Sequence, residues 1–253
     1  MVSGAVDRSA SNERQAPGAV DRSASNEVWR ELYAYAWPRL AGLACQAHLE
    51  GMARLEYGKS QQPQLERVQQ SVREWTGWEL VRAHGEVPAP KFFELLSRRE
   101  FPLVFELRPL EQIYASVQPD LWHELLGHAP LLLNREIAAL YEWFGRAGVA
   151  AHMQSATAFE EICKLYWFTA EYGLVRQGWK TKIMGAGLLA SPLGPDSVRH
   201  RKVKIRRFTI RRVLVASYNP YQYQGLLFRV ASISSLHRQL RAAYDKRLGL
   251  SQM

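Results

Sequence analysis

Two histidines and a glutamate lie close together in one short stretch of the sequence. The stretch is residues 119–134, PDLWHELLGHAPLLLN, in which Glu124 directly follows His123 and His128 comes five residues after His123. Imidazole nitrogens and carboxylate oxygens are common protein ligands of zinc and iron. In the zinc-protease pattern HExxH the histidines are four residues apart and share one face of a helix. Five residues turn an α-helix so far that the two side chains would point about 140° apart.

Gly127 and Pro130 offer a way for the second histidine to reach the first. Glycine leaves helical geometry easily, and a proline two residues past His128 discourages the helix from continuing. We therefore expect the helix to end near Gly127 and His128 to fold back toward His123. The spacing argues against the zinc-protease pattern and is equally compatible with a metal site and with capping or surface histidines. A metal-dependent hydrolase that uses Glu124 as its base stays an alternative function.

A third ligand would decide between these alternatives, and Glu171 is the best candidate. It lies in the segment KLYWFTAEYGL, with Trp167 and Phe168 about one turn before it and Tyr172 immediately after it. Carboxylates are rarely buried without a partner. Glu171 therefore either faces water, with Lys164 as a surface partner, or binds a cation. Two histidines and one carboxylate would leave three positions of an octahedral iron(II) open for dioxygen, whereas catalytic zinc usually keeps one.

The elements that must position these residues are predicted to be mainly helical. Helical spacing of apolar residues predicts helices within 28–55 (interrupted at Pro38), 63–81, 88–101, 119–128 (capped by Asp120), 134–148, 155–178 (stopped by Gly178) and 234–248. Residues 202–217 and 224–232 alternate in polarity and are rich in β-branched residues, so they predict a short two-stranded β-ribbon. The predicted fold class is mainly α, with a small β-ribbon.

The N-terminus differs in character from the rest of the chain. The decapeptide GAVDRSASNE occurs at 4–13 and again at 18–27. This small, polar unit cannot bury a core. We expect residues 1–27 to form a disordered leader and residues 28–253 to form one domain.

Composition narrows the class of protein further. No apolar run approaches the roughly 18 residues of a membrane span, so we expect no membrane partner. The two cysteines, Cys45 and Cys163, are far apart and indicate a reducing cytoplasm rather than a disulfide framework. Of the net charge of +9, eight positive charges lie in residues 199–212, which contain no acid. Because no groove-reading motif accompanies them, we interpret them as a solvated surface and keep nucleic-acid binding as an alternative function.

Several separated motifs together resemble one family. PDLWHELLGHAPLL, YWFTAEYGL and GAGLLASP occur in the order and spacing of the catalytic domain of the pterin-dependent aromatic amino acid hydroxylases, especially the short bacterial phenylalanine hydroxylases. The likeness extends to TGWELV, KFFELLSRREFPL, ELRPLEQIYASVQPD and SYNPYQYQGLLFRVASISSL, and it covers about residues 28–240.

The resemblance implies a single, largely helical catalytic domain over residues 28–253. It implies an iron(II)- and tetrahydropterin-dependent monooxygenase that hydroxylates the ring of an aromatic L-amino acid, by default phenylalanine to tyrosine at the para carbon. The pterin would be tetrahydrobiopterin or a bacterial analogue. The implied site consists of the iron ligands His123, His128 and Glu171; the catalytic, pterin-side Glu124; the pterin neighbours Leu96, Phe101 and Tyr166; and the substrate neighbours Arg108, Ser116, Pro119, Trp167 and Gly187. The chain lacks length for the regulatory domain and tetramerising helix of the animal enzymes, so we expect a monomer whose partners are the amino acid, dioxygen and pterin.

Some residues depart from the family pattern. Ala190 stands where the family usually has a serine that hydrogen-bonds a ligand histidine, Met184 replaces a tyrosine, and Tyr172 replaces a phenylalanine. Pro220 falls in a region that lines the substrate pocket. These departures leave open a phenylalanine 3-hydroxylase, which would give meta-tyrosine, and a tryptophan hydroxylase. Trp167 favours phenylalanine, because tryptophan-specific members tend to carry phenylalanine there.

Overall fold

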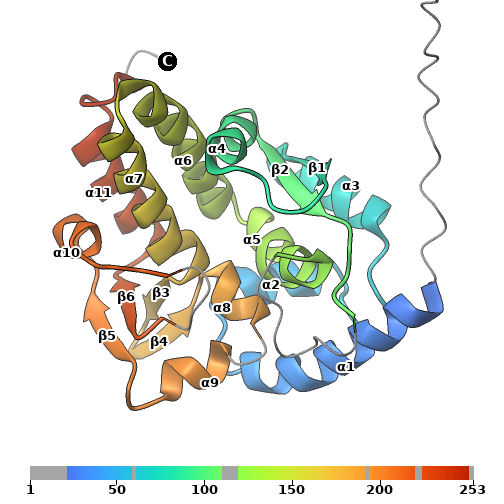
Figure 1. Cartoon of the computed structure of the whole chain (residues 1–253). Helices are drawn as coiled ribbons and strands as arrows, with labels where there is room; N and C mark the ends of the chain where they lie inside the picture. Colours follow the sequence, from blue (N-terminus) through green and yellow to red (C-terminus); the bar gives the residue numbers. More distant parts are fainter. Residues whose placement is uncertain (1–21, 59–60, 110–118, 192–193, 220–223, 251–253) are drawn as a thin grey trace, which may run out of the picture.

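A computed structural model describes residues 22–58, 61–109, 119–191, 194–219 and 224–250. Helices dominate the fold, which also contains two small sheets that lie apart from each other (Figure 1). In chain order the elements are α1 (Arg22–Leu40), α2 (Gln46–Arg54), α3 (Leu65–Thr76), β1 (Glu79–Ala83), α4 (Ala89–Ser97), β2 (Glu100–Val104), η2 (His123–His128), α5 (Ala129–Leu132), α6 (Arg135–Gln154), α7 (Ala156–Tyr166), η3 (Trp167–Glu171), β3 (Leu174–Gln177), β4 (Lys180–Ile183), α8 (Ala186–Ala190), α9 (Gly194–Arg199), β5 (Lys204–Arg207), α10 (Ile210–Leu214), β6 (Leu226–Val230) and α11 (Ile233–Tyr244).

Three of the longer helices begin at polar side chains that cap them. Asn134 accepts hydrogen bonds from the first backbone amides of α6, and Ser155 and Ser232 do the same for α7 and α11. The short connection at Ser155 lays α7 back along α6, and α11 packs on α6 at the same side of the molecule (Figure 1). The mainly helical fold class is confirmed, although α1 begins at Arg22, ahead of the predicted domain boundary at Val28. The predicted leader otherwise lies outside the described residues.

The predicted two-stranded ribbon is part of a larger sheet. Strands β5 and β6 do pair, but in parallel, and they belong to a four-stranded sheet in the order β4-β3-β6-β5. Strands β3 and β4 form an antiparallel hairpin whose turn contains Gly178, with a φ of 59°. Gly178 was therefore wrongly predicted to stop a helix, because the preceding helix already ends at Glu171. A second sheet pairs β1 with β2 in parallel.

Two further expectations are refined by the fold. Pro38 does not interrupt α1 but lies within its last turn, and the helix ends two residues later at Leu40. The basic segment forms the exposed edge strand β5 and the neighbouring α10. Positive charges on an edge strand discourage pairing with a second sheet. No helix in the described part of the chain has both the length and the apolar character that crossing a bilayer requires.

The core that fixes the site is continuous and rich in aromatic residues. It contains the fully buried rings of Trp29, Trp78, Trp122 and Phe144, and side chains from helices at both ends of the sequence. Helix α8 contacts both η2 and η3, and α5 contacts both α2 and α6. The two segments η2 and η3 are therefore held by several neighbouring elements, and most of their residues are buried.

Candidate metal centre and active site

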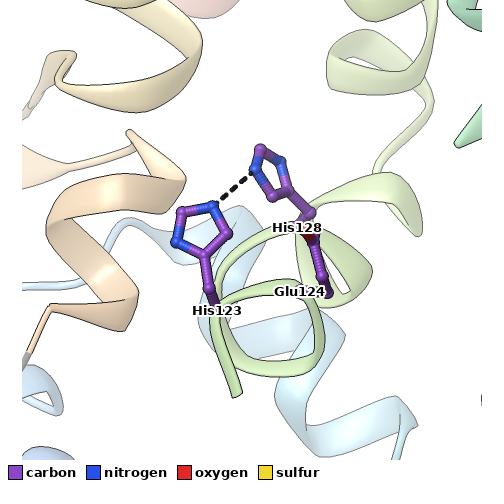
Figure 2. A group of neighbouring side chains, drawn as sticks. All are labelled: His123, Glu124 and His128. Atoms are coloured by element: carbon purple, nitrogen blue, oxygen red, sulfur yellow. Dashed lines mark hydrogen bonds between the residues drawn. The ribbon is translucent and has the colours of Figure 1, made fainter. Parts of the chain in front are cut away.

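The two histidines meet because their helix widens. Residues 123–128 form a π-helix, in which the backbone amide of Ala129 donates to the carbonyl of Glu124, five residues earlier. Backbone hydrogen bonds that span five residues place side chains five positions apart nearly above one another along the helix. The Nε2 atoms of His123 and His128 consequently lie 3.1 Å apart, with both rings turned toward each other (Figure 2). The expectation that the helix ends near Gly127 is wrong, because the chain continues directly into α5.

Gly127 acts through its size rather than by ending the helix. A Cβ atom at this position would lie 2.9 Å from the carbonyl oxygen of Ala186 and 3.1 Å from its methyl group. Only glycine therefore lets α8 approach η2 this closely. Helix α8 in turn contacts η3, so this close approach brings the two segments that carry the candidate ligands together.

Glu171 reaches the histidines from a second π-helical segment. The amide of Tyr172 donates to the carbonyl of Trp167 at 2.8 Å, again across five residues. The Glu171 carboxylate lies 3.2 Å from Nε2 of His128 and 3.7 Å from Nε2 of His123. The alternative in which Lys164 partners Glu171 at the surface is wrong.

Lys164 has other partners. Its ammonium group pairs with Glu160 at 3.2 Å and donates to the carbonyl of Leu214 at 3.3 Å. The buried carboxylate of Glu171 is thus left facing the two imidazoles, with its side chain only 13% exposed.

Electrostatics favour the protonation state that binds a cation. Burial raises the pKa of the Glu171 carboxyl, but the imidazoles of His128 and His123 outweigh it and lower that pKa to about 2. Burial lowers the pKa of His123 to about 4, although the Glu171 carboxylate opposes this change. At neutral pH the site therefore holds an ionised carboxylate beside a neutral His123 imidazole, and metal ligands must be deprotonated in this way.

Glu124 is the second carboxyl group near the imidazoles. Its ligand atom and those of His123 and His128 all lie within 4.8 Å of one another, so proximity alone would make it a ligand too. Burial, together with the charges of Glu171 and Asp120, raises the pKa of Glu124 well above its usual value. A carboxyl group that is held neutral is a poor cation ligand, so the ionised Glu171 is the better third ligand.

The separations of the donor atoms suit three ligands of one metal ion. Metal–ligand bonds of about 2.1 Å place adjacent donor atoms about 3.0 Å apart in octahedral geometry and about 3.4 Å apart in tetrahedral geometry. The two Nε2 atoms are 3.1 Å apart, and the Glu171 carboxylate oxygens are 3.2 Å from Nε2 of His128 and 3.7 Å from Nε2 of His123. Oε2 of Glu124 and Nε1 of Trp167 are buried without a hydrogen-bond partner in the described part of the chain. Such atoms are rare in folded proteins unless a ligand or water completes them.

Arg108 is fixed by an ion pair that the sequence did not reveal. Its Nε and Nη2 atoms each donate to a different carboxylate oxygen of Asp120 at 2.8 Å, and both side chains are buried. Asp120 also accepts from the amide of His123 at 3.1 Å, which confirms it as the cap of the helix that begins at Leu121 and continues as η2. Asp120 thus links the predicted substrate arginine to the metal helix. Of the other predicted substrate residues, Pro119 is exposed beside it and Ser116 lies outside the described residues.

The predicted aromatic residues divide into two groups around the centre. Phe101 is buried with its ring 4.6 Å from the imidazole of His128. Trp167 stacks on Tyr172 at 4.7 Å and contacts the tilted ring of Tyr218 at 5.2 Å. Tyr218 was missed by the sequence analysis, because a loop residue far along the chain carries no local signal for this contact.

Of the remaining predicted residues, Tyr166 and Gly187 lie beside Glu171. Leu96 is fully buried at the end of α4, and the buried Tyr166 lies close enough to Glu171 to help lower its pKa. A Cβ added to Gly187 would lie 3.3 Å from the Glu171 carboxylate. The structure therefore brings Tyr166 and Gly187 to the centre and places Leu96 in the core, and the roles of all three toward pterin and substrate stay predictions.

Fold and site together define a class of protein. Residues 15–249 match the sequence profile of the biopterin-dependent aromatic amino acid hydroxylases, and the chain belongs to this family of enzymes. It is 33% identical to phenylalanine-4-hydroxylase of Chromobacterium violaceum over 213 residues, which cover 83% of this chain and 70% of that protein. It is 34% identical to human tyrosine 3-monooxygenase over 219 residues, 85% of this chain and 41% of the human protein.

A solved structure supports the same assignment. Phenylalanine hydroxylase from C. violaceum, with bound iron(III) and oxidised 7,8-dihydrobiopterin, aligns with a TM-score of 0.81 and 30% identity over 91% of this chain and 83% of that one. The family expectation drawn from the sequence motifs is therefore confirmed.

Proposed function

We propose that this protein is an iron(II)- and tetrahydropterin-dependent monooxygenase that hydroxylates phenylalanine to tyrosine. The observation that carries the proposal is the convergence of the Nε2 atoms of His123 and His128 with the Glu171 carboxylate inside a protein of this family. These three residues would hold the iron in a facial arrangement. Bound iron(II) and tetrahydropterin would together supply the activation of dioxygen, and the protein would supply binding, orientation and electrostatics.

The substrate would be held by an arginine and a tryptophan. The planar guanidinium of Arg108, fixed by Asp120, suits recognition of the amino acid carboxylate. Trp167 is held by its two tyrosine neighbours and presents a rigid aromatic surface. It lies four residues before Glu171 on the same π-helical segment. A preorganised aromatic wall orients an aromatic ring at little entropic cost.

Glu124 is assigned to the pterin side of the centre. Its neutral carboxyl group, with Oε2 unpaired in the described part of the chain, can donate a hydrogen bond to a pterin nitrogen or to a water molecule. Phe101, whose ring lies 4.6 Å from the imidazole of His128, adds an apolar surface beside the ligands and limits the access of water. The buried Leu96 is assigned to the same pterin side.

Product analysis tests this function directly. Iron-loaded protein is incubated with tetrahydropterin, dioxygen and either phenylalanine, tyrosine or tryptophan, and the products are separated by chromatography. We expect para-tyrosine from phenylalanine. Meta-tyrosine or hydroxytryptophan as the main product would replace the proposed substrate or ring position, and no product from any of the three amino acids would refute the function.

A ligand variant completes the test. Glu171→Ala should abolish turnover, whereas Glu160→Ala, which alters an exposed glutamate of α7 paired with Lys164, should leave turnover unchanged. Retained turnover in Glu171→Ala would remove Glu171 from the ligand set.

We also propose that the protein acts as a cytoplasmic monomer without a nucleic-acid partner. The sparse cysteines support the compartment, and the basic residues fall on an exposed edge strand, where they have a structural role. Light scattering would test the monomer, and a DNA mobility shift at low salt that disappears in Arg206→Ala and Arg207→Ala would contradict the absence of a nucleic-acid partner.

A further inference from the structure

The imidazole of His128 has a separate partner at each of its two nitrogens. Nε2 lies 3.1 Å from Nε2 of His123 and 3.2 Å from the Glu171 carboxylate, on the side of the candidate ion. Nδ1 lies 3.2 Å from the hydroxyl of Tyr141, on the opposite side. In the described part of the chain, no side chain hydrogen-bonds Nδ1 of His123, so this contact distinguishes the two histidines.

The chemistry of imidazole gives this contact a direction. A neutral imidazole that offers the lone pair of Nε2 to a cation carries its proton on Nδ1. That Nδ1–H group would donate to the hydroxyl oxygen of Tyr141. A hydrogen bond at the distal nitrogen of a ligand histidine fixes both its tautomer and the orientation of its ring.

Tyr141 is placed rigidly enough to perform this task. It lies in α6, whose first turn is capped by Asn134, and its side chain is 1% exposed. Its ring stacks on Phe101 with 6.3 Å between the centroids and 27° between the planes, and Phe101 also contacts the His128 ring. The tyrosine hydroxyl and the phenylalanine face therefore restrict the imidazole from two directions.

We propose that Tyr141 is a positioning residue of the metal centre, which holds His128 in the tautomer and orientation that present Nε2 to the ion. The proposal rests on the proposed function only insofar as an ion binds His123, His128 and Glu171. Tyr141 acts through His128.

Metal affinity, rather than turnover, provides the test. Fe(II) and Co(II) affinities are measured by competition with a chromophoric chelator for the wild type, Tyr141→Phe and Tyr57→Phe. Tyr141→Phe keeps the ring and removes the hydroxyl. Tyr57→Phe removes a buried hydroxyl that has no hydrogen-bond partner in the described residues, so it is a matched control. We expect Tyr141→Phe to bind about 10- to 100-fold more weakly, as for other losses of a supporting partner, and the control to bind like the wild type.

A second measurement does not depend on the variant folding. Nitrogen-15 spectra of the wild-type protein loaded with diamagnetic Zn(II) report the tautomer of each histidine. We expect His128 to carry its proton on Nδ1, and a proton on Nε2 would overturn the proposal. Equal metal affinity in wild type and a folded Tyr141→Phe would also overturn it while leaving the proposed function intact. A wild type that binds neither Fe(II) nor Co(II) would refute the proposed function itself.

Discussion

Acid should destabilise the protein through His48, a buried histidine that supports the metal helix. His48 lies in α2 and is 0% exposed, and its Nε2–H group donates to the carbonyl of Leu126 in η2 at 2.7 Å. Burial lowers the pKa of His48 from 6.5 to about 4. The opposing effect of the hydrogen bond to Leu126 is too small to compensate.

The sign of the pH effect follows from the protons bound in each state. Between pH 6.5 and about 4 the unfolded chain protonates this imidazole and the folded chain does not. The free energy of unfolding therefore falls as the pH is lowered through this window, and the loss is complete below it. This difference in pKa corresponds to a loss of about 3 kcal/mol in the free energy of unfolding once the pH is below both pKa values. Between pH 8 and pH 5 the loss is about 2 kcal/mol.

Urea unfolding of the metal-free protein, followed by tryptophan fluorescence, measures this loss. His123, with a pKa lowered to about 4, titrates in the same window, so the contribution of His48 is isolated by difference. His48→Gln is the matched variant, because its amide can still donate to the Leu126 carbonyl and does not titrate. We expect the wild type to lose about 2 kcal/mol more than His48→Gln between pH 8 and pH 5.

The outcome against this reasoning is equally definite. If His48→Gln and the wild type lose stability in parallel over this pH range, the buried imidazole does not resist protonation, and the assignment of His48 as a neutral donor is wrong.

Three further predictions concern the site directly. Glu171→Gln should weaken Fe(II) binding, measured by chelator competition, by more than the roughly 100-fold that loss of a supporting partner costs. Glu124→Gln, which mimics a neutral carboxyl group, should retain Fe(II) binding. If instead Glu124→Gln binds Fe(II) more weakly than Glu171→Gln, the roles of the two glutamates are exchanged. Asp120→Asn should lower the free energy of unfolding by about 3–5 kcal/mol in urea titrations, because it leaves the buried guanidinium of Arg108 without its charge partner; a loss below about 1 kcal/mol would show the pair to be dispensable. Gly127→Ala should cost about 1–3 kcal/mol and weaken Fe(II) binding, because its methyl group would force α8 away from η2; unchanged binding would contradict the role given to this close approach.

Sequence patterns predicted the helices that carry the site better than their ends. Helical periodicity is a local signal, and the helices that it predicted over 134–148 and from 155 onward are present as α6 and α7. The end of the 155–178 helix was misjudged because Gly178 also suits a hairpin turn. The choice between the two depends on strand pairing with distant residues, which no local pattern reports.

The candidate ligands were predictable as residue types, whereas their geometry was not. Two histidines and a glutamate were recognisable as possible metal ligands from their side-chain chemistry. In the α-helix assumed from the sequence, however, the side chains of His123 and His128 would point apart. The π-helical widening that unites them depends on tertiary packing, including the approach of α8 at Gly127. The local sequence around Asp120 indicates only a helix cap, and that around Tyr141 only a core position. Neither indicates the ion pair with Arg108 or the contact with His128.

The two π-helical turns have a consequence for how the chain tolerates change in length. One extra residue in a regular α-helix rotates every later side chain by about 100°. In η2 the extra residue is accommodated within a single π-helical turn, so the side chains of α5 and of the helices beyond it stay directed toward their present neighbours. Removing Leu126 would leave the two histidines four residues apart. The same deletion would rotate the downstream helices away from the elements that they now contact. The register of half the domain is thus tied to the same few backbone hydrogen bonds that align the metal ligands.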